Sequence, residues 1–231
     1  VTGGNVSLYN ESPTGAIYPT PTIGMVGVVE DVDHITTISF RNEGDLVILL
    51  GSNTDELGGS EYLKVIHGLV AGDAPAIDLA FERRLQQSLL AAIRTGRICS
   101  AHDVAEGGLA VTLAECAMSN SAAPRGVSIQ LQDVAPTNAL LFGEAQSRIV
   151  ISCRPGDADG LLNHFAEARV PARVIGTVGG VRGVFLVEAP DATIQLPISE
   201  IARTYYSAIP RRMDRTPQDV ATALESEVHR L

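Results

Sequence analysis

A polar, glycine-containing loop that runs directly into an apolar helix constrains the fold of this chain more than any other stretch. It lies within residues 99–117, where three polar residues, His102, Asp103 and Glu106, precede the pair Gly107-Gly108. Apolar residues then recur at positions compatible with one helix face: Leu109, Val111, Leu113, Ala114 and Ala117. A short strand predicted at 98–101 would deliver the chain to the N-terminus of this helix.

Two interpretations of this loop fit its residues. A helix N-terminus offers unpaired N–H groups and the positive end of the helix dipole, and paired glycines let an anion approach the backbone closely. Alternatively, Asp103 or Glu106 only caps the helix, and Gly107-Gly108 relieve crowding where the helix packs on a sheet. Spacing alone favours the second interpretation, because isolated glycine pairs are common in turns.

Charge and composition restrict the classes of partner. The 231 residues include 27 acidic and 17 basic side chains, a formal net charge of −10, with no run of Lys or Arg. Nucleic acid and anionic membranes are therefore not expected as partners. No apolar run has the length of a membrane span, and no signal-peptide pattern opens the chain. The three cysteines match no metal-binding spacing, which indicates a reduced, cytoplasmic setting.

The pattern of apolar residues predicts an α/β (α+β) fold, in the form of an α/β sandwich with a mixed sheet. Strands and helices intermingle without strict alternation, which argues against a doubly wound parallel sheet. A domain boundary is expected near residue 32, with an α/β domain over 33–210 and a tail over 211–231. Strands are predicted at 17–29, 35–40, 45–51, 98–101, 127–131, the end of 140–152, 172–178 and 184–188, and helices at 63–67, 78–95, 109–117, 157–169 and 198–208.

Three further polar stretches are candidate sites. In Gly3-Gly4-Asn5-Val6-Ser7 a glycine, an amide and a hydroxyl would suit a nucleotide phosphate and its magnesium ion, although an ordinary turn is the simpler interpretation. Gly58-Gly59-Ser60 could bind an anion, or Ser60 could cap a helix. Residues 143–148, which include Glu144 and Gln146, could contribute to a site or only solvate the entrance of the strand that follows.

Together these motifs resemble the second half of the large, ATP-dependent subunit of the phosphoribosylformylglycinamidine synthases. The resemblance covers residues 3–208 and begins with GGNVSLYNE at 3–11 and IYPTPTIGMVG at 17–27. It continues in the expected order with LGGSEY at 57–62, AHDVAEGGL at 101–109 and LFGEAQSR at 141–148. The HDxxEGG type is similar also to the wider superfamily of aminoimidazole ribonucleotide synthetase, selenophosphate synthetase and thiamine-monophosphate kinase. Gly3 stands where a serine is more usual.

The resemblance implies a fragment with defined roles for its residues. Residues 1–32 would end the second N-type, ATP-binding domain, and 33–210 would form the second C-type domain. The catalytic histidine and most magnesium carboxylates belong to the first half, so no catalytic residue is expected here. By the motif match, Gly4 would contact ATP, Asn5 would bind magnesium and Ser7 would contact the ribonucleotide substrate. The residues expected to serve an auxiliary nucleotide site or a domain interface are Asp103, Glu106, Gly107, Gly108, Glu144 and Gln146.

The implied activity is that of an ATP-dependent C–N ligase in de novo purine biosynthesis. It converts formylglycinamide ribonucleotide, ATP and glutamine-derived ammonia to formylglycinamidine ribonucleotide, with ATP and Mg²⁺ as cofactors. The implied partners are the first half of the same enzyme, a glutaminase subunit and a small carrier subunit, and a homo-oligomer stays open. The alternatives are a non-catalytic docking domain and a free-standing superfamily kinase. The lack of an upstream Asp-rich metal motif argues against the kinase.

Overall fold

The computed structural model describes residues 1–5, 11–13, 15–16 and 21–214. The chain divides into two compact units, Val1–Ile35 and Thr36–Leu231. In the first unit, β1 (Gly3–Asn5) pairs antiparallel with β4 (Thr22–Gly24), and β2 (Glu11–Ser12) pairs with β3 (Gly15–Ala16). The short 3-10 helix η1 (Val32–His34) follows, capped by the Asp31 side chain. The boundary expected near residue 32 falls inside η1 and stays a prediction.

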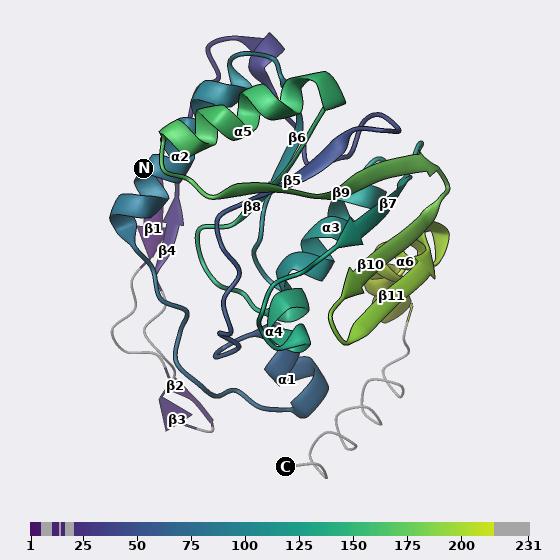
Figure 1. Ribbon diagram of the computed structural model, residues 1–231. Helices are drawn as coiled ribbons and strands as arrows, with labels where there is room; N and C mark the ends of the chain where they lie inside the picture. Colours follow the sequence, from purple (N-terminus) through teal and green to yellow (C-terminus); the bar gives the residue numbers. More distant parts are fainter. Residues whose placement is uncertain (6–10, 14, 17–20, 215–231) are drawn as a thin grey trace. The chain divides into compact units, whose positions relative to one another are not determined.

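A seven-stranded mixed sheet forms the centre of the second unit (Figure 1). Its strand order is β11-β10-β7-β9-β5-β8-β6, and all neighbours are antiparallel except β10 and β7, which are parallel. The mixed α/β architecture expected from the sequence is therefore confirmed. The strands are β5 (Leu46–Leu50), β6 (Ile98–Asp103), β7 (Arg125–Gln130), β8 (Ile149–Cys153), β9 (Ala172–Val181), β10 (Val184–Ala189) and β11 (Ala192–Pro197).

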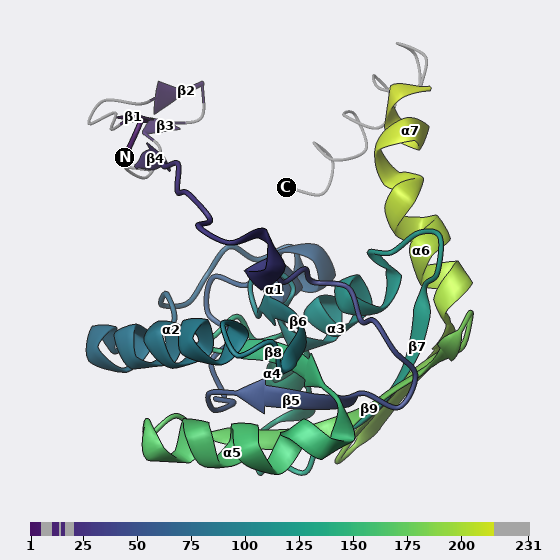
Figure 2. The same ribbon diagram turned by 90° about the horizontal axis from the view of Figure 1, so that it is seen from above.

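Two hydrophobic cores pack on this sheet, and β5 contributes to both. Successive strand side chains point to opposite faces. Val47 and Leu49 accordingly join a core with α3, α4 and α6, while Ile48 and Leu50 join a core with α2 and α5. The helices are α1 (Glu61–His67), α2 (Leu79–Ile93), α3 (Gly108–Met118), α4 (Thr137–Phe142), α5 (Ala158–Glu167, after the 3-10 helix η2, Pro155–Asp157), α6 (Ile198–Tyr206) and α7 (Ala208–Met213). In Figure 2, α6 continues into α7.

Helix ends follow the local signals in the sequence. The Ser60 hydroxyl accepts a hydrogen bond from the Leu63 N–H, so Ser60 caps α1 as one of its two interpretations predicts. Asp78 caps α2 by accepting from the N–H groups of Ala80 and Phe81. Gly96 has the left-handed backbone expected just beyond that helix, with φ of +70°.

The prediction of a strand at 35–40 is wrong, because the structure has no strand there. This segment makes single backbone bonds instead of a ladder: the Phe40 N–H donates to the Cys116 carbonyl, and the Thr37 carbonyl accepts from the Ala101 N–H. Phe40 is buried in the core that includes α3, whereas Ile35 and Ile38 are exposed, and the segment does not join the sheet. The pattern also missed β11, because this edge strand is mostly exposed and lacks a buried alternation.

Near the N-terminus, the turn interpretation of residues 3–7 is wrong for its described part, since Gly3–Asn5 form β1. Of the strand expected over 17–29, residues 17–20 lie outside the described residues and β4 covers only Thr22–Gly24.

Among described helices, none is both long and apolar enough to cross a membrane. The three cysteines are buried and unpaired, and burial raises the pKa of Cys153 to about 11 and that of Cys99 and Cys116 above the usual range.

Gly176 in β9 tests how closely β7 and β9 approach. A Cβ at this position would lie 2.1 Å from the Ser128 carbonyl oxygen, so Gly176→Ala forces the two central strands apart. We expect a loss of about 1–3 kcal/mol in the free energy of unfolding, measured by urea denaturation. Gly156→Ala is the control, because nothing lies within 4 Å of its Cβ. Equal stability of both variants would contradict the packing described.

Candidate functional site

Three loops of the second unit meet at the side chain of Glu144, which lies between α4 and β8. Its Oε1 accepts a hydrogen bond from the backbone N–H of Glu61, the first residue of α1, at 2.9 Å. The same oxygen accepts from the N–H of Gly107, which precedes α3, at 2.8 Å. The motifs at 57–62, 101–109 and 141–148, which are distant in sequence, thus share one carboxylate.

This carboxylate occupies the kind of position that an anion prefers. The first N–H groups of a helix lack partners within the helix, and the helix dipole favours negative charge beside them. Hydrogen bonds to an ionised acceptor are stronger than those between neutral groups. Glu144 therefore ties the starts of α1 and α3 together and supplies a partner to the Gly107 N–H from within the protein.

The capping role considered for Asp103 or Glu106 is wrong. The residue before α3 is Gly107, and no side chain caps this helix there. Asp103, at the end of β6, and Glu106 are both exposed. The acidic group that contacts the helix start is Glu144 instead. Local spacing could not indicate this, because Glu144 lies 37 residues from Gly107 and 83 from Glu61.

The crowding interpretation of the glycine pair describes the structure better. Gly107 and Gly108 have φ of +83° and +72°, a region that side chains disfavour. A Cβ on Gly108 would lie 2.6 Å from the carbonyl carbon of Phe142 and 2.7 Å from the oxygen of Gly143. The glycine is needed because the start of α3 packs directly against the end of α4, not against the sheet.

Arg148 fixes the turn that carries Glu144. The guanidinium is buried, with 2% of the residue exposed, and donates to the carbonyls of Ala145 and Gly143 and to Asn53 Oδ1. Burial lowers the pKa of Arg148 to about 10, and the carboxylate of Glu56 opposes this shift, so the group stays protonated at neutral pH. The interpretation that residues 143–148 only solvate the entrance of the strand is therefore wrong for Arg148. It describes Gln146, whose side chain is exposed.

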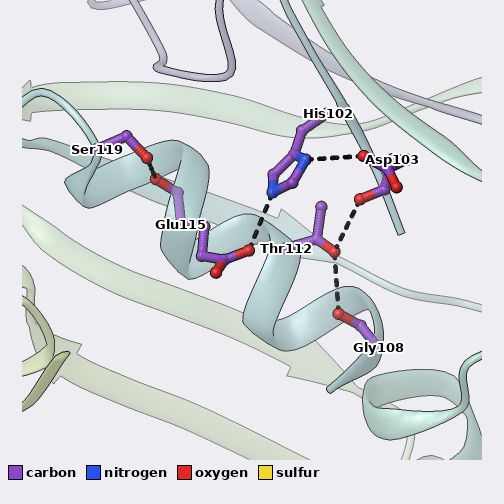
Figure 3. Close-up of polar contacts among 6 residues, drawn as sticks. All are labelled: His102, Asp103, Gly108, Thr112, Glu115 and Ser119. Carbon is purple, nitrogen blue, oxygen red and sulfur yellow. Dashed lines mark hydrogen bonds and ion pairs between the residues drawn. The ribbon is translucent and has the colours of Figure 1, made fainter. Parts of the chain in front are cut away.

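A histidine and two carboxylates form a second polar cluster beside α3 (Figure 3). His102 Nε2 lies 2.9 Å from Glu115 Oε2, and Nδ1 lies 3.3 Å from Asp103 Oδ1. Within α3, the Thr112 hydroxyl donates to the Gly108 carbonyl. No local pattern in the sequence points to Glu115, which reaches His102 only because α3 folds back beside β6. Among the described residues, no group of three or more His, Cys, Asp or Glu side chains could hold a metal ion.

The N-terminal candidates lie in the first unit. Gly4 and Asn5 belong to β1, opposite Ile23 and Thr22 of β4, and both are exposed. A Cβ on Gly4 would lie 3.0 Å from the Thr22 carbonyl oxygen, a tight contact that any side chain would make and that glycine avoids. Ser7 lies outside the described residues.

Comparisons of sequence identify related proteins. Residues 42–188 match the family model for the C-terminal domain of AIR synthase related proteins. The chain is 47% identical over 227 residues to the phosphoribosylformylglycinamidine synthase subunit PurL of Symbiobacterium thermophilum, and 44% identical over 215 residues to that of Moorella thermoacetica. Each alignment covers 93% of this chain but 29% of the relative, so the chain spans less than a third of the length of these relatives. The resemblance found in the motifs is confirmed.

Comparisons of structure show the same fold. The structure is similar to that of Thermotoga maritima PurL complexed with FGAR, with a TM-score of 0.62, 17% identity, and coverage of 74% of this chain and 30% of that one. It is also similar to phosphoribosylformylglycinamidine synthase II from the same organism, with a TM-score of 0.60, 16% identity, and coverage of 74% and 28%. At these identities the likeness supports the fold alone.

Replacement of Glu144 tests its link between the two helix starts. Glu144→Ala leaves two backbone N–H groups without their acceptor, so we expect a loss of about 1–3 kcal/mol in the free energy of unfolding. Glu144→Gln keeps an oxygen acceptor and should lose less. Urea denaturation measures both, with Gln146→Ala as the exposed control, expected within about 0.5 kcal/mol of the parent chain. A similar loss in Gln146→Ala would contradict the role of Glu144.

Proposed function

The chain belongs to the AIR synthase related proteins through their C-terminal domain, and on that premise we propose that it is the C-terminal part of a phosphoribosylformylglycinamidine synthase subunit. The observation that carries this proposal is the 47% identity to a PurL subunit over 93% of the chain. The complete enzyme would convert formylglycinamide ribonucleotide, ATP and ammonia to formylglycinamidine ribonucleotide, ADP and phosphate.

The first unit is proposed to line the reaction site, with Gly4 facing ATP, Asn5 binding Mg²⁺ and Ser7 contacting the ribonucleotide. The exposure of Gly4 and Asn5 supports this assignment. An amide oxygen suits Mg²⁺, which takes oxygen ligands and keeps several waters. Among the described residues, no group of three or more His, Cys, Asp or Glu side chains is placed to hold a metal ion. The other ligands are proposed to lie in the rest of the subunit. The relatives in T. maritima include PurL complexed with ATP and PurL complexed with FGAR.

In this reaction the substrate's amide oxygen attacks the γ-phosphorus of ATP, ADP leaves, and ammonia then displaces phosphate from the activated carbon. Such phosphoryl transfer depends mainly on positioning and on neutralising the charge of the phosphoryl group. Mg²⁺ would supply part of that neutralisation. The contribution of this chain is to orient the triphosphate and the ribonucleotide against catalytic residues held elsewhere in the subunit.

The second unit is proposed to have a structural or interface role. The Gly107 N–H, which could have met a phosphate, already donates to Glu144. This observation favours an interface or framework function for Asp103, Glu106, Gly107, Gly108, Glu144 and Gln146 over turnover. The second candidate function is a docking domain for the glutaminase and carrier subunits. A complex named PurLQS is among the similar structures from T. maritima.

An activity assay separates these functions. The chain is mixed with the remaining part of the subunit, formylglycinamide ribonucleotide, ATP, Mg²⁺ and ammonium, and ADP release is measured. We expect Asn5→Ala to lower kcat/KM about 10-fold to 100-fold and to raise the Mg²⁺ concentration required, because a metal ligand is lost. Ser7→Ala should raise KM for the ribonucleotide.

Asn163→Ala is the matched control, since Asn163 is exposed on α5 and has no assigned role. Unchanged rates in Asn5→Ala and Ser7→Ala would leave only the docking function. ADP release by the chain alone, at the rate of the complete mixture, would instead indicate a free-standing kinase.

A further inference from the structure

An apolar groove runs between α3 and α6 in the second unit. Its volume is about 380 Å³, and its lining includes Val111 and Ala114 of α3, Leu196 of β11, and Ile201 and Tyr205 of α6. Several of these side chains remain accessible: Val111 is 36% exposed, Leu196 38% and Tyr205 53%. A contiguous apolar surface of this kind is typical of a docking site.

The apolar surface continues beyond the groove along α7. Tyr205, Ile209 and Met213 recur every four residues, and the last two are 70% and 79% exposed. Because α6 continues into α7 (Figure 2), this spacing places the three residues along one side of the helical pair. The groove and this stripe together form one apolar surface, which we call the α3/α6 surface.

We propose that the α3/α6 surface binds residues 215–231 of the same chain. These 17 residues follow directly after Asp214, the C-cap residue of α7. In their sequence, Val220, Leu224, Val228 and Leu231 recur at intervals of four, four and three residues, the spacing of one helix face. Pro217 precedes this pattern and favours a turn, which would let the segment run back along α6.

Length and charge both suit this occupant. A helix over 218–231 would be about 20 Å long at about 1.5 Å per residue, enough to follow α3 or α6 over their whole lengths. Across α6 and α7 together, three exposed arginines, Arg203, Arg211 and Arg212, outnumber the one acidic side chain, Glu200, which lines the groove. Residues 219–227 include three acidic side chains, Asp219, Glu225 and Glu227, and no basic one. Opposite charges at the rim of an apolar contact favour one register of docking.

Disulfide trapping in the chain of 231 residues tests this proposal. Val111→Cys is combined with Leu224→Cys on the apolar face or, as a matched control, with Ser226→Cys on the polar face. The native thiols are buried with raised pKa values and should stay unreactive. Under mild oxidation we expect the Leu224→Cys pair to form a disulfide within one chain at least ten times faster than the control, as seen by non-reducing electrophoresis and peptide mapping. Equal rates, or disulfides only between two chains, would overturn the proposal.

Hydrogen exchange provides a second measurement that needs no cysteine. Leu224→Asp should increase amide exchange in α3 and α6 several-fold relative to the parent chain, whereas Ser226→Asp should leave it unchanged. Unchanged exchange in Leu224→Asp would overturn the proposal. Neither experiment uses ATP, substrate or another subunit, so their failure and a failure of the proposed function are distinguishable.

Discussion

The carboxylate of Glu144 is the contact on which the arrangement of the second unit depends. It accepts hydrogen bonds from the first turns of two helices and so fixes the starts of α1 and α3 relative to the end of α4. The contact of α1, α3 and the end of α4 at Glu144 also explains why particular residues stand next to it. Gly108 lacks a side chain because the Phe142–Gly143 backbone lies against it, and buried Arg148 holds the carbonyls of the Glu144 turn. A carboxylate and a guanidinium thus stabilise one turn from two sides.

This contact also bears on how the proposed enzyme divides its work. A helix start attracts negative charge whether the charge comes from a phosphate or from a side chain. In the second unit a side chain supplies it, which supports a framework role for loops that resemble nucleotide-binding ones. The first unit differs, because the motif residues Gly4 and Asn5 are exposed on β1. The proposed site residues lie in the smaller unit, and we propose that the larger unit supplies the framework and the surfaces for partners.

The sequence predicted those elements whose signals are local. The Asp78 cap and Gly96 bracket α2 closely, and the continuous apolar run at 46–50 forms a strand buried on both faces. The predictions failed where long-range contacts decide. Residues 35–40 carry strand-like residues, yet Phe40 bonds to the end of α3. The exposed β11 is a strand only because β10 pairs with it.

The candidate site shows the same limit more sharply. The motifs were sufficient to identify the family, because a family likeness depends on residue order and needs no knowledge of contacts. The physical role of each motif residue depends on its neighbours in space. Asp103, Glu106 and Glu144 are all acidic residues near glycines in the sequence, and only the fold distinguishes the one that reaches the helix starts. An acidic side chain can mimic the anion that a glycine loop would otherwise bind. The carboxylate nearest to such a loop must therefore be located before a ligand is assigned to the loop.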